Sequence, residues 1–181
     1  MVSILILAAC GGENDPEETT ETKPQSEEQA DNEHADMNMT GSGDVPEGLE
    51  EAENPTYEVG SQATIEKDHM DGMKGAQATI VGAYDTTVYT VSYTPTTGGE
   101  RVTDHKWVIH EELKDLSEEP LEPGEEATIQ ASHMEGMDGA TATIDSAKQT
   151  TVYMVDFTLT TSGEKVTNHK WVTEDELSSA K

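Results

Sequence analysis

The stretch Thr86-Thr87-Val88-Tyr89-Thr90-Val91-Ser92-Tyr93 is the clearest strand in the chain. Its large residues, Tyr89, Val91 and Tyr93, alternate with small polar ones, and this period of two is typical of a half-buried β-strand. The stretch recurs at 150–157, where the alternation is kept although one aromatic residue has changed. The sequence therefore predicts a fold that contains two copies of this strand.

The whole region around the strand is duplicated. Residues 60–113 align with residues 124–177 without a gap, and more than half of the aligned positions are identical. Self-similarity on this scale predicts two copies of one structural unit. We assign residues 57–117 to the first repeat, 118–123 to a short acidic linker with two prolines, and 124–181 to the second repeat.

Each repeat carries the signals of an all-β domain. Short apolar segments at 63–65, 76–80, 86–93 and 102–108 are separated by glycine-rich or polar turns. About five short strands in so small a unit have to curl to bury both faces. The prediction is two tandem small SH3-like (KOW-like) barrels after a disordered acidic N-terminal tether. An OB-like barrel is the alternative.

Composition limits what this protein binds. Only 33% of the 181 residues are hydrophobic and 4% aromatic, and the formal net charge is -28. Such a chain repels the phosphates of nucleic acid and anionic lipid headgroups, and it attracts cations. The sequence has no convincing nucleophile and base pairing and no glycine-rich phosphate loop. We therefore expect no enzyme activity and no nucleic-acid partner.

The N-terminus has the features of a lipoprotein. The segment Leu7-Ala8-Ala9-Cys10 resembles a bacterial lipobox, in which the cysteine is acylated after cleavage. We assign residues 1–9 to the remnant of a signal peptide and 10–56 to the lipidated Cys10 and a disordered acidic linker, because high charge and low hydrophobicity oppose folding. The expected location is the extracytoplasmic face of the cell membrane, with the lipid anchor as the membrane contact. A disordered apolar N-terminus is the alternative.

Two loops carry the ligands of a soft metal. His69-Met70-Asp71-Gly72-Met73 in the first repeat corresponds to His133-Met134-Glu135-Gly136-Met137 in the second. Glycine disfavours a helix here and favours a tight loop that brings side chains together. Imidazole nitrogen and thioether sulfur bind Cu(I), and Ag(I) as a second soft ion, better than they bind hard cations.

A second motif follows each loop at the same distance, His105-Lys106-Trp107 and His169-Lys170-Trp171. On a strand, residues i and i+2 share a face, so each histidine lies beside its tryptophan. The histidine would complete the metal site and the indole would shield it. The predicted ligands are His69, Met70, Met73 and His105 in one site and His133, Met134, Met137 and His169 in the other, with Trp107 and Trp171 as caps.

Less specific interpretations of these residues stay open. Methionines commonly fill cores, and a tryptophan commonly anchors a small barrel. His34, Met37 and Met39 in the acidic tract are either polar filler or a weak, flexible third metal site.

The doubled pattern His-Met-x-Gly-Met-x-Gly-Ala-x-Ala-Thr-Ile, followed each time by His-Lys-Trp-Val and preceded by a lipobox and an acidic spacer, resembles the YdhK (DUF1541) family of lipoproteins from Gram-positive bacteria. Some members bind copper at the cell surface. The resemblance implies a monomeric lipoprotein that sequesters copper, with a copper-exporting ATPase as a candidate partner. The alternative is a cell-wall or protein-binding module without metal, in which both tryptophans lie exposed in a groove.

Overall fold

The computed structural model describes residues 40–115 and 117–180. No helix in this part of the chain is long and apolar enough to cross a membrane. The elements, in chain order, are β1 (Glu50–Glu51), β2 (Gln62–Ile65), β3 (Gln77–Tyr93), β4 (Val102–Ile109), the 3-10 turn η1 (His110–Glu112), β5 (Glu126–Thr128), β6 (Thr141–Thr158), β7 (Lys165–Thr173), the 3-10 turn η2 (Glu174–Glu176) and β8 (Leu177–Ser179).

Several N-terminal expectations fall outside the described residues. They are the signal-peptide remnant at 1–9, the acylation of Cys10, and the weak third metal site formed by His34, Met37 and Met39. These stay predictions.

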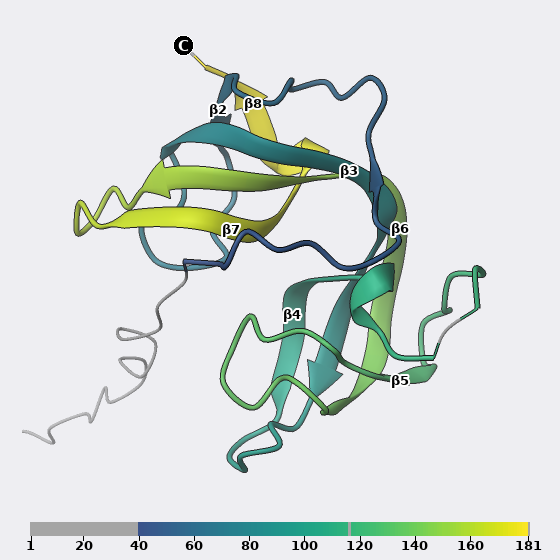
Figure 1. Ribbon diagram of the computed structural model, residues 1–181. Coiled ribbons are helices and arrows are strands. Elements are labelled where there is room, and N and C mark those ends of the chain that lie inside the picture. Colours follow the sequence, from purple (N-terminus) through teal and green to yellow (C-terminus); the bar gives the residue numbers. More distant parts are fainter. Residues whose placement is uncertain (1–39, 116, 181) are drawn as a thin grey trace, which may run out of the picture. The chain divides into compact units, whose positions relative to one another are not determined.

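Two long antiparallel strands, β3 and β6, form the centre of the sheet. At the middle of this ribbon Thr86 pairs with Thr150, its own counterpart in the other repeat. Pairing of equivalent residues means that the repeats are related by an approximate twofold axis through the ribbon. Figure 1 shows both long strands passing from one half of the sheet into the other.

Each half of the sheet buries a core that takes residues from both repeats. The first core joins the beginning of the first repeat to the end of the second: Ala63, Ile65, Met73, Ala76, Ala78, Ile80 and Ala83 pack with Tyr153, Val155, Phe157, Val166, Val172 and Leu177. The second core joins the end of the first repeat to the beginning of the second: Tyr89, Val91, Tyr93, Val108 and Leu113 pack with Ala127, Ile129, Ala131, Met137, Ala140, Ala142 and Ile144. A smaller cluster contains Tyr84, Val88, Ile109, Val152, Met154 and Trp171.

The short strands at the edges of the sheet also pair with residues from the other repeat. The short strand β2 pairs with β8 from the other repeat, with Ile65 opposite Leu177. The equivalent contact in the other half is the single bridge between Leu113 and Ile129. The beginning of each repeat therefore pairs with the end of the other repeat.

The all-β prediction is confirmed, with one difference in how the strands are shared. One open sheet runs through both repeats, in place of a separate closed barrel from each. The sequence pattern divides residues 76–93 into two strands, but the segment between them, which contains Gly82 and Asp85, forms no turn and continues as part of β3. A 17-residue strand is too long to stay within one small barrel, so its second half pairs and packs beyond its own repeat.

The boundary of the predicted disordered linker needs correction. We predicted disorder up to residue 56, but residues 40–56 are described and lie along the sheet. Strand β1 pairs with β3, and the Gly41 N–H donates to the carbonyl oxygen of Thr167 at 2.9 Å. Leu49 packs against the smaller cluster. A few backbone hydrogen bonds and one apolar anchor outweigh the acidic composition, which is an average over the whole tract.

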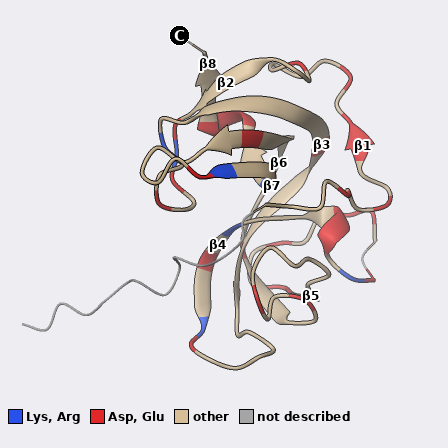
Figure 2. Cartoon of the chain, turned by 60° about the vertical axis from the view of Figure 1, so that its left-hand side comes forward, with Lys and Arg blue, Asp and Glu red and all other residues tan. Residues whose placement is uncertain are grey.

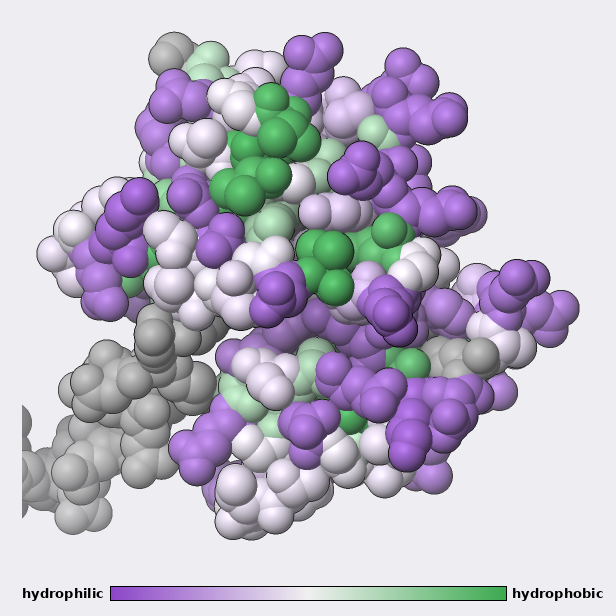
Figure 3. All heavy atoms as spheres, in the orientation of Figure 1, coloured by the Kyte–Doolittle hydropathy of each residue, from purple (hydrophilic) through white to green (hydrophobic). Residues whose placement is uncertain are grey.

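The surface of the described chain is strongly acidic. Figure 2 shows Asp and Glu along the turns and edges of the sheet, with few Lys or Arg. On the face shown in Figure 3, hydrophobic residues form small patches separated by hydrophilic ones. This surface raises the local concentration of cations and offers no broad apolar docking area on that face.

Candidate functional site

The two glycine loops expected from the sequence lie between β2 and β3 and between β5 and β6. In each, the N–H of the second methionine donates to the carbonyl oxygen of the first, at 3.2 Å in both loops. Gly72 and Gly136 have φ angles of +80° and +73°. Glycine adopts this conformation at little cost, whereas other residues are strained there.

Gly72→Ala is expected to destabilise the fold more than Gly75→Ala, because only the first glycine is in close contact. A Cβ at Gly72 would lie 2.3 Å from the hydroxyl oxygen of Thr161, while a Cβ at Gly75 would meet nothing within 4 Å. Their φ angles are +80° and +81°, so the conformational strain, about 1–2 kcal/mol, is matched. We expect a further loss of about 1–3 kcal/mol at Gly72 in urea unfolding. Equal losses would contradict the contact.

The two methionines of each loop have different surroundings. Met73 and Met137 are 0% exposed and belong to the first and second cores. Met70 and Met134 are partly buried and pack against the rims of the same cores. The core-filler interpretation therefore fits Met73 and Met137, and it leaves one methionine in each loop within reach of an ion from solvent.

A buried carboxylate holds the loop histidine of the first repeat. His69 Nε2 lies 2.8 Å from Glu176 Oε1, and the Trp107 Nε1–H and the Thr173 backbone N–H donate to Glu176 Oε2 at 2.9 and 3.0 Å. We call these residues the His69 cluster. Burial raises the pKa of the Glu176 carboxyl, but the hydrogen bonds and the neighbouring His69 outweigh it and lower the pKa to about 2.

The second repeat has the same arrangement. His133 Nε2 lies 2.8 Å from Glu112 Oε1, and the Trp171 Nε1–H and the Ile109 backbone N–H donate to Glu112 Oε2 at 3.1 and 3.2 Å. We call these residues the His133 cluster. In both clusters the carboxylate comes from the other repeat than the histidine, so each cluster depends on the exchange of strands.

Sequence reasoning missed both carboxylates. A signal was present, since each repeat ends in an acidic residue directly before a leucine, Glu112-Leu113 and Glu176-Leu177. In so acidic a chain these residues look like part of a solvated surface. Their burial, at 4% and 3% exposure, follows from the 3-10 turn that ends each repeat and directs them inward.

The downstream histidine of the first repeat lies beside the loop of the second. The His105 ring centroid is 6.3 Å from that of His133 and 5.9 Å from that of Tyr93. The Tyr93 hydroxyl in turn donates to Met134 Sδ at 3.8 Å. The prediction grouped His105 with the loop of its own repeat. The structure places its ring near that of His133, and Tyr93 contacts both it and Met134, because β4 packs in the half of the sheet that the second loop covers.

His105 is suited to act as a neutral ligand. Its Nε2 atom is buried and has no hydrogen-bond partner among the described residues. Burial lowers the pKa of His105 to about 4, helped by His133 and His69 and opposed by the smaller effect of Glu112. At neutral pH the ring is uncharged, so one ring nitrogen carries a lone pair.

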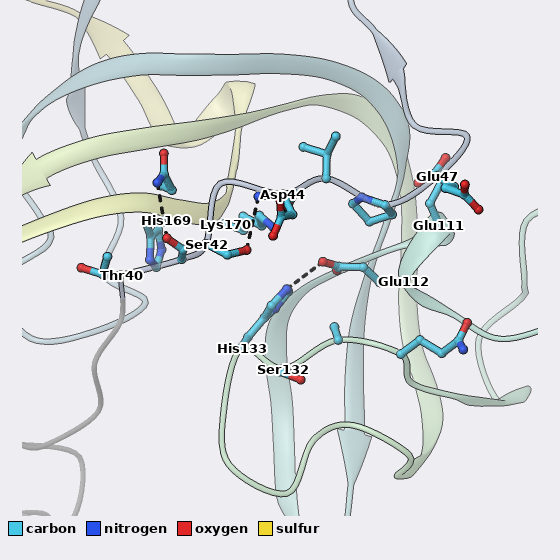
Figure 4. Close-up of a pocket in the computed structure, with 16 residues that line it drawn as sticks. Thr40, Ser42, Asp44, Glu47, Glu111, Glu112, Ser132, His133, His169 and Lys170 are labelled. Atoms are coloured by element: carbon cyan, nitrogen blue, oxygen red, sulfur yellow. Dashed lines mark hydrogen bonds and ion pairs between the residues drawn. The ribbon is translucent and has the colours of Figure 1, made fainter.

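The downstream histidine of the second repeat lies against the first core. The His169 ring centroid is 5.5 Å from that of Phe157, and Met70 packs on the same core. His169 also lines an open pocket of about 610 Å³, together with His133, Glu112 and the segment 40–47. Figure 4 shows His133 and His169 on opposite sides of this pocket.

The predicted tryptophan caps differ from one another. The Trp107 ring centroid is 6.5 Å from that of His69, while Trp171 is 0% exposed within the smaller cluster. In the described part of the chain, no group of three or more His, Cys, Asp or Glu is arranged to hold a metal ion.

Comparisons with known proteins agree on one family. The family described as "Protein of unknown function (DUF1541)" matches residues 59–110 and 123–174. The uncharacterized protein YdhK of Bacillus subtilis is 59% identical over 175 residues, which cover 97% of this chain and 83% of that protein. A crystal structure of YdhK matches with a TM-score of 0.78 and 66% identity, covering 81% of this chain and 100% of that one. A solution structure of its C-terminal domain matches with a TM-score of 0.65 and 68% identity, covering 67% and 92%.

Proposed function

The chain belongs to the DUF1541 family, and from this premise we propose that it is a lipid-anchored protein of the extracytoplasmic face that binds Cu(I) and thereby sequesters copper. The observation that carries the proposal is the buried Nε2 of His105, which has no hydrogen-bond partner among the described residues and belongs to a ring 6.3 Å from that of His133. Tyr93 contacts both the His105 ring and Met134. A buried nitrogen without a hydrogen bond is unfavourable, and coordination of a metal relieves that cost.

The donor set fits a soft monovalent ion. Two neutral imidazoles and one thioether bring no negative charge, so hard divalent cations gain little from them. The pKa of His105, lowered to about 4, removes competition from protons at neutral pH. We assign His105, His133 and Met134 as the ligands in the half of the sheet that contains the second core. Ag(I) is expected to bind the same donors.

The approximate twofold axis gives the second site. The equivalent ligands are His169, His69 and Met70 beside the first core, where His169 and Met70 both pack. Each proposed site thus combines the loop of one repeat with the downstream histidine of the other. Met73 and Met137, which the sequence prediction included as ligands, are reassigned to core packing because they are fully buried.

The two kinds of methionine give a matched test. Anaerobic titration of the full chain with Cu(I), in competition with a chelator, is expected to give two tight sites. Met70→Leu/Met134→Leu should lose tight binding, while the control Met73→Leu/Met137→Leu should keep it, because Leu replaces a core methionine at nearly constant volume. Wild-type protein that takes up no Cu(I), or equal affinity in the two double variants, would overturn the proposal.

The metal-free alternative, a wall-binding or peptide-binding module, has less support. It needs both tryptophans exposed in a groove, but Trp171 is 0% exposed and donates its indole N–H to the buried Glu112. Trp107 is only partly exposed.

The anchor and the partner are part of the same proposal. Acylation of Cys10 would hold the copper sites at the membrane, where a copper-exporting ATPase is the candidate partner. Labelling of cells with an alkyne fatty acid tests the anchor: wild-type protein should take up the label, and Cys10→Ala should not.

A further inference from the structure

Glu112 and Glu176 are buried carboxylates that the proposed ligand sets do not use. Each accepts hydrogen bonds from an indole N–H and from a backbone N–H on the same oxygen, Oε2, at distances between 2.9 and 3.2 Å. The remaining oxygen, Oε1, lies 2.8 Å from the Nε2 atom of His69 or His133. The two copies make the same three contacts.

These contacts decide which nitrogen of each loop histidine carries the proton. Indole and backbone N–H groups only donate, so Oε2 of each carboxylate accepts both, and these two hydrogen bonds favour the ionised carboxylate over the carboxylic acid. An ionised carboxylate can only accept, so the imidazole nitrogen at 2.8 Å has to be the donor. A neutral His69 or His133 is therefore protonated at Nε2 and carries its lone pair on Nδ1.

We propose that Glu176 and Glu112 are positioning residues that fix His69 and His133 as Nε2–H tautomers, so that each histidine binds metal through Nδ1. The inference rests on the proposed copper function and deepens it. A carboxylate on the far nitrogen of a ligating histidine orients the ring and makes the other nitrogen a better donor. The same carboxylates bind Trp107 and Trp171, so the tryptophan of each cluster helps to hold its histidine through the carboxylate.

Glu112→Gln/Glu176→Gln tests this role with little change of shape. The glutamine oxygen can accept from the indole and backbone N–H groups, while its amide N–H group faces the imidazole. The imidazole Nε2 then has to accept, and the proton moves to Nδ1. We expect Cu(I) affinity to fall roughly 10- to 100-fold, the usual effect of losing such a partner. Glu111→Gln/Asp175→Asn removes the same charge from the same turns and should leave affinity unchanged.

The tautomers are read in the metal-free full chain by long-range ¹H–¹⁵N spectra of the histidine rings at neutral pH. We expect Nε2–H for His69 and His133 in the wild type and Nδ1–H in the glutamine variant. A wild-type proton on Nδ1, an unchanged tautomer in the variant, or a changed tautomer with unchanged Cu(I) affinity would each overturn the inference. Because the spectra need no metal, wild-type Nε2–H rings in a chain that binds no Cu(I) would mark a failure of the copper proposal and, with it, of the metal-positioning role.

Discussion

A single repeat, expressed as residues 40–116 or 117–181, is expected to stay unfolded as a monomer at micromolar concentration. Each repeat contains only half of each core, since the first core draws on β2, β3, β6 and β7 and the second on the complementary halves. Without its partner a repeat would expose both half-cores to water, and a typical domain is stable by only roughly 5–15 kcal/mol, so a repeat that lacks half of each core is not expected to fold alone. Circular dichroism and light scattering measure the outcome.

Mixing the two fragments is the control. The missing strands are then supplied in trans, and we expect a one-to-one complex with the spectrum of the intact chain. A self-associated repeat, with two copies exchanging strands about the same axis, would also agree with the fold, because the ribbon already pairs Thr86 with its counterpart Thr150. A monomeric repeat that unfolds cooperatively would contradict the exchange.

The metal-free protein is expected to lose stability in acid in two stages. The pKa of His105 is lowered from 6.5 to about 4, so between these values the unfolded chain binds a proton that the native chain does not. The pKa of Glu176 is lowered from 4.5 to about 2, which gives the same sign at lower pH. Stability is therefore complete above about pH 6.5 and falls as pH decreases through both ranges.

The lower stage can be assigned to one buried pair, Glu176 and His69. Glu176 is 3% exposed, and a shift of this size corresponds to stability on the order of 3 kcal/mol, lost between about pH 4.5 and 2. Urea unfolding at a series of pH values measures both stages. Glu176→Gln should flatten the lower stage, while Asp175→Asn, an exposed neighbour, should change it little. A constant unfolding free energy from pH 6.5 to 3 is the result that contradicts this account.

Local features of the site were predictable because they depend on nearby residues. The alternation at Tyr89, Val91 and Tyr93 predicted a strand, and those residues are 0% exposed. Gly72 and Gly136 predicted tight loops with positive φ, which the structure contains. The roles of the methionines were not predictable, since the same thioether serves as core filler at Met73 and lies at a core rim at Met70.

The all-β class, the duplication, the strand and loop positions, and the set of histidines and methionines available to a soft metal all follow from local sequence patterns. Which of these side chains lie close together depends on how the strands of the two repeats pair. Two repeats with nearly the same strands offer almost identical contacts whether each strand pairs within its repeat or across to the other, so local pattern cannot separate the two arrangements. The unbroken length of β3 and β6 selects the crossed one, and that choice sets His105 beside His133 and Glu176 beside His69.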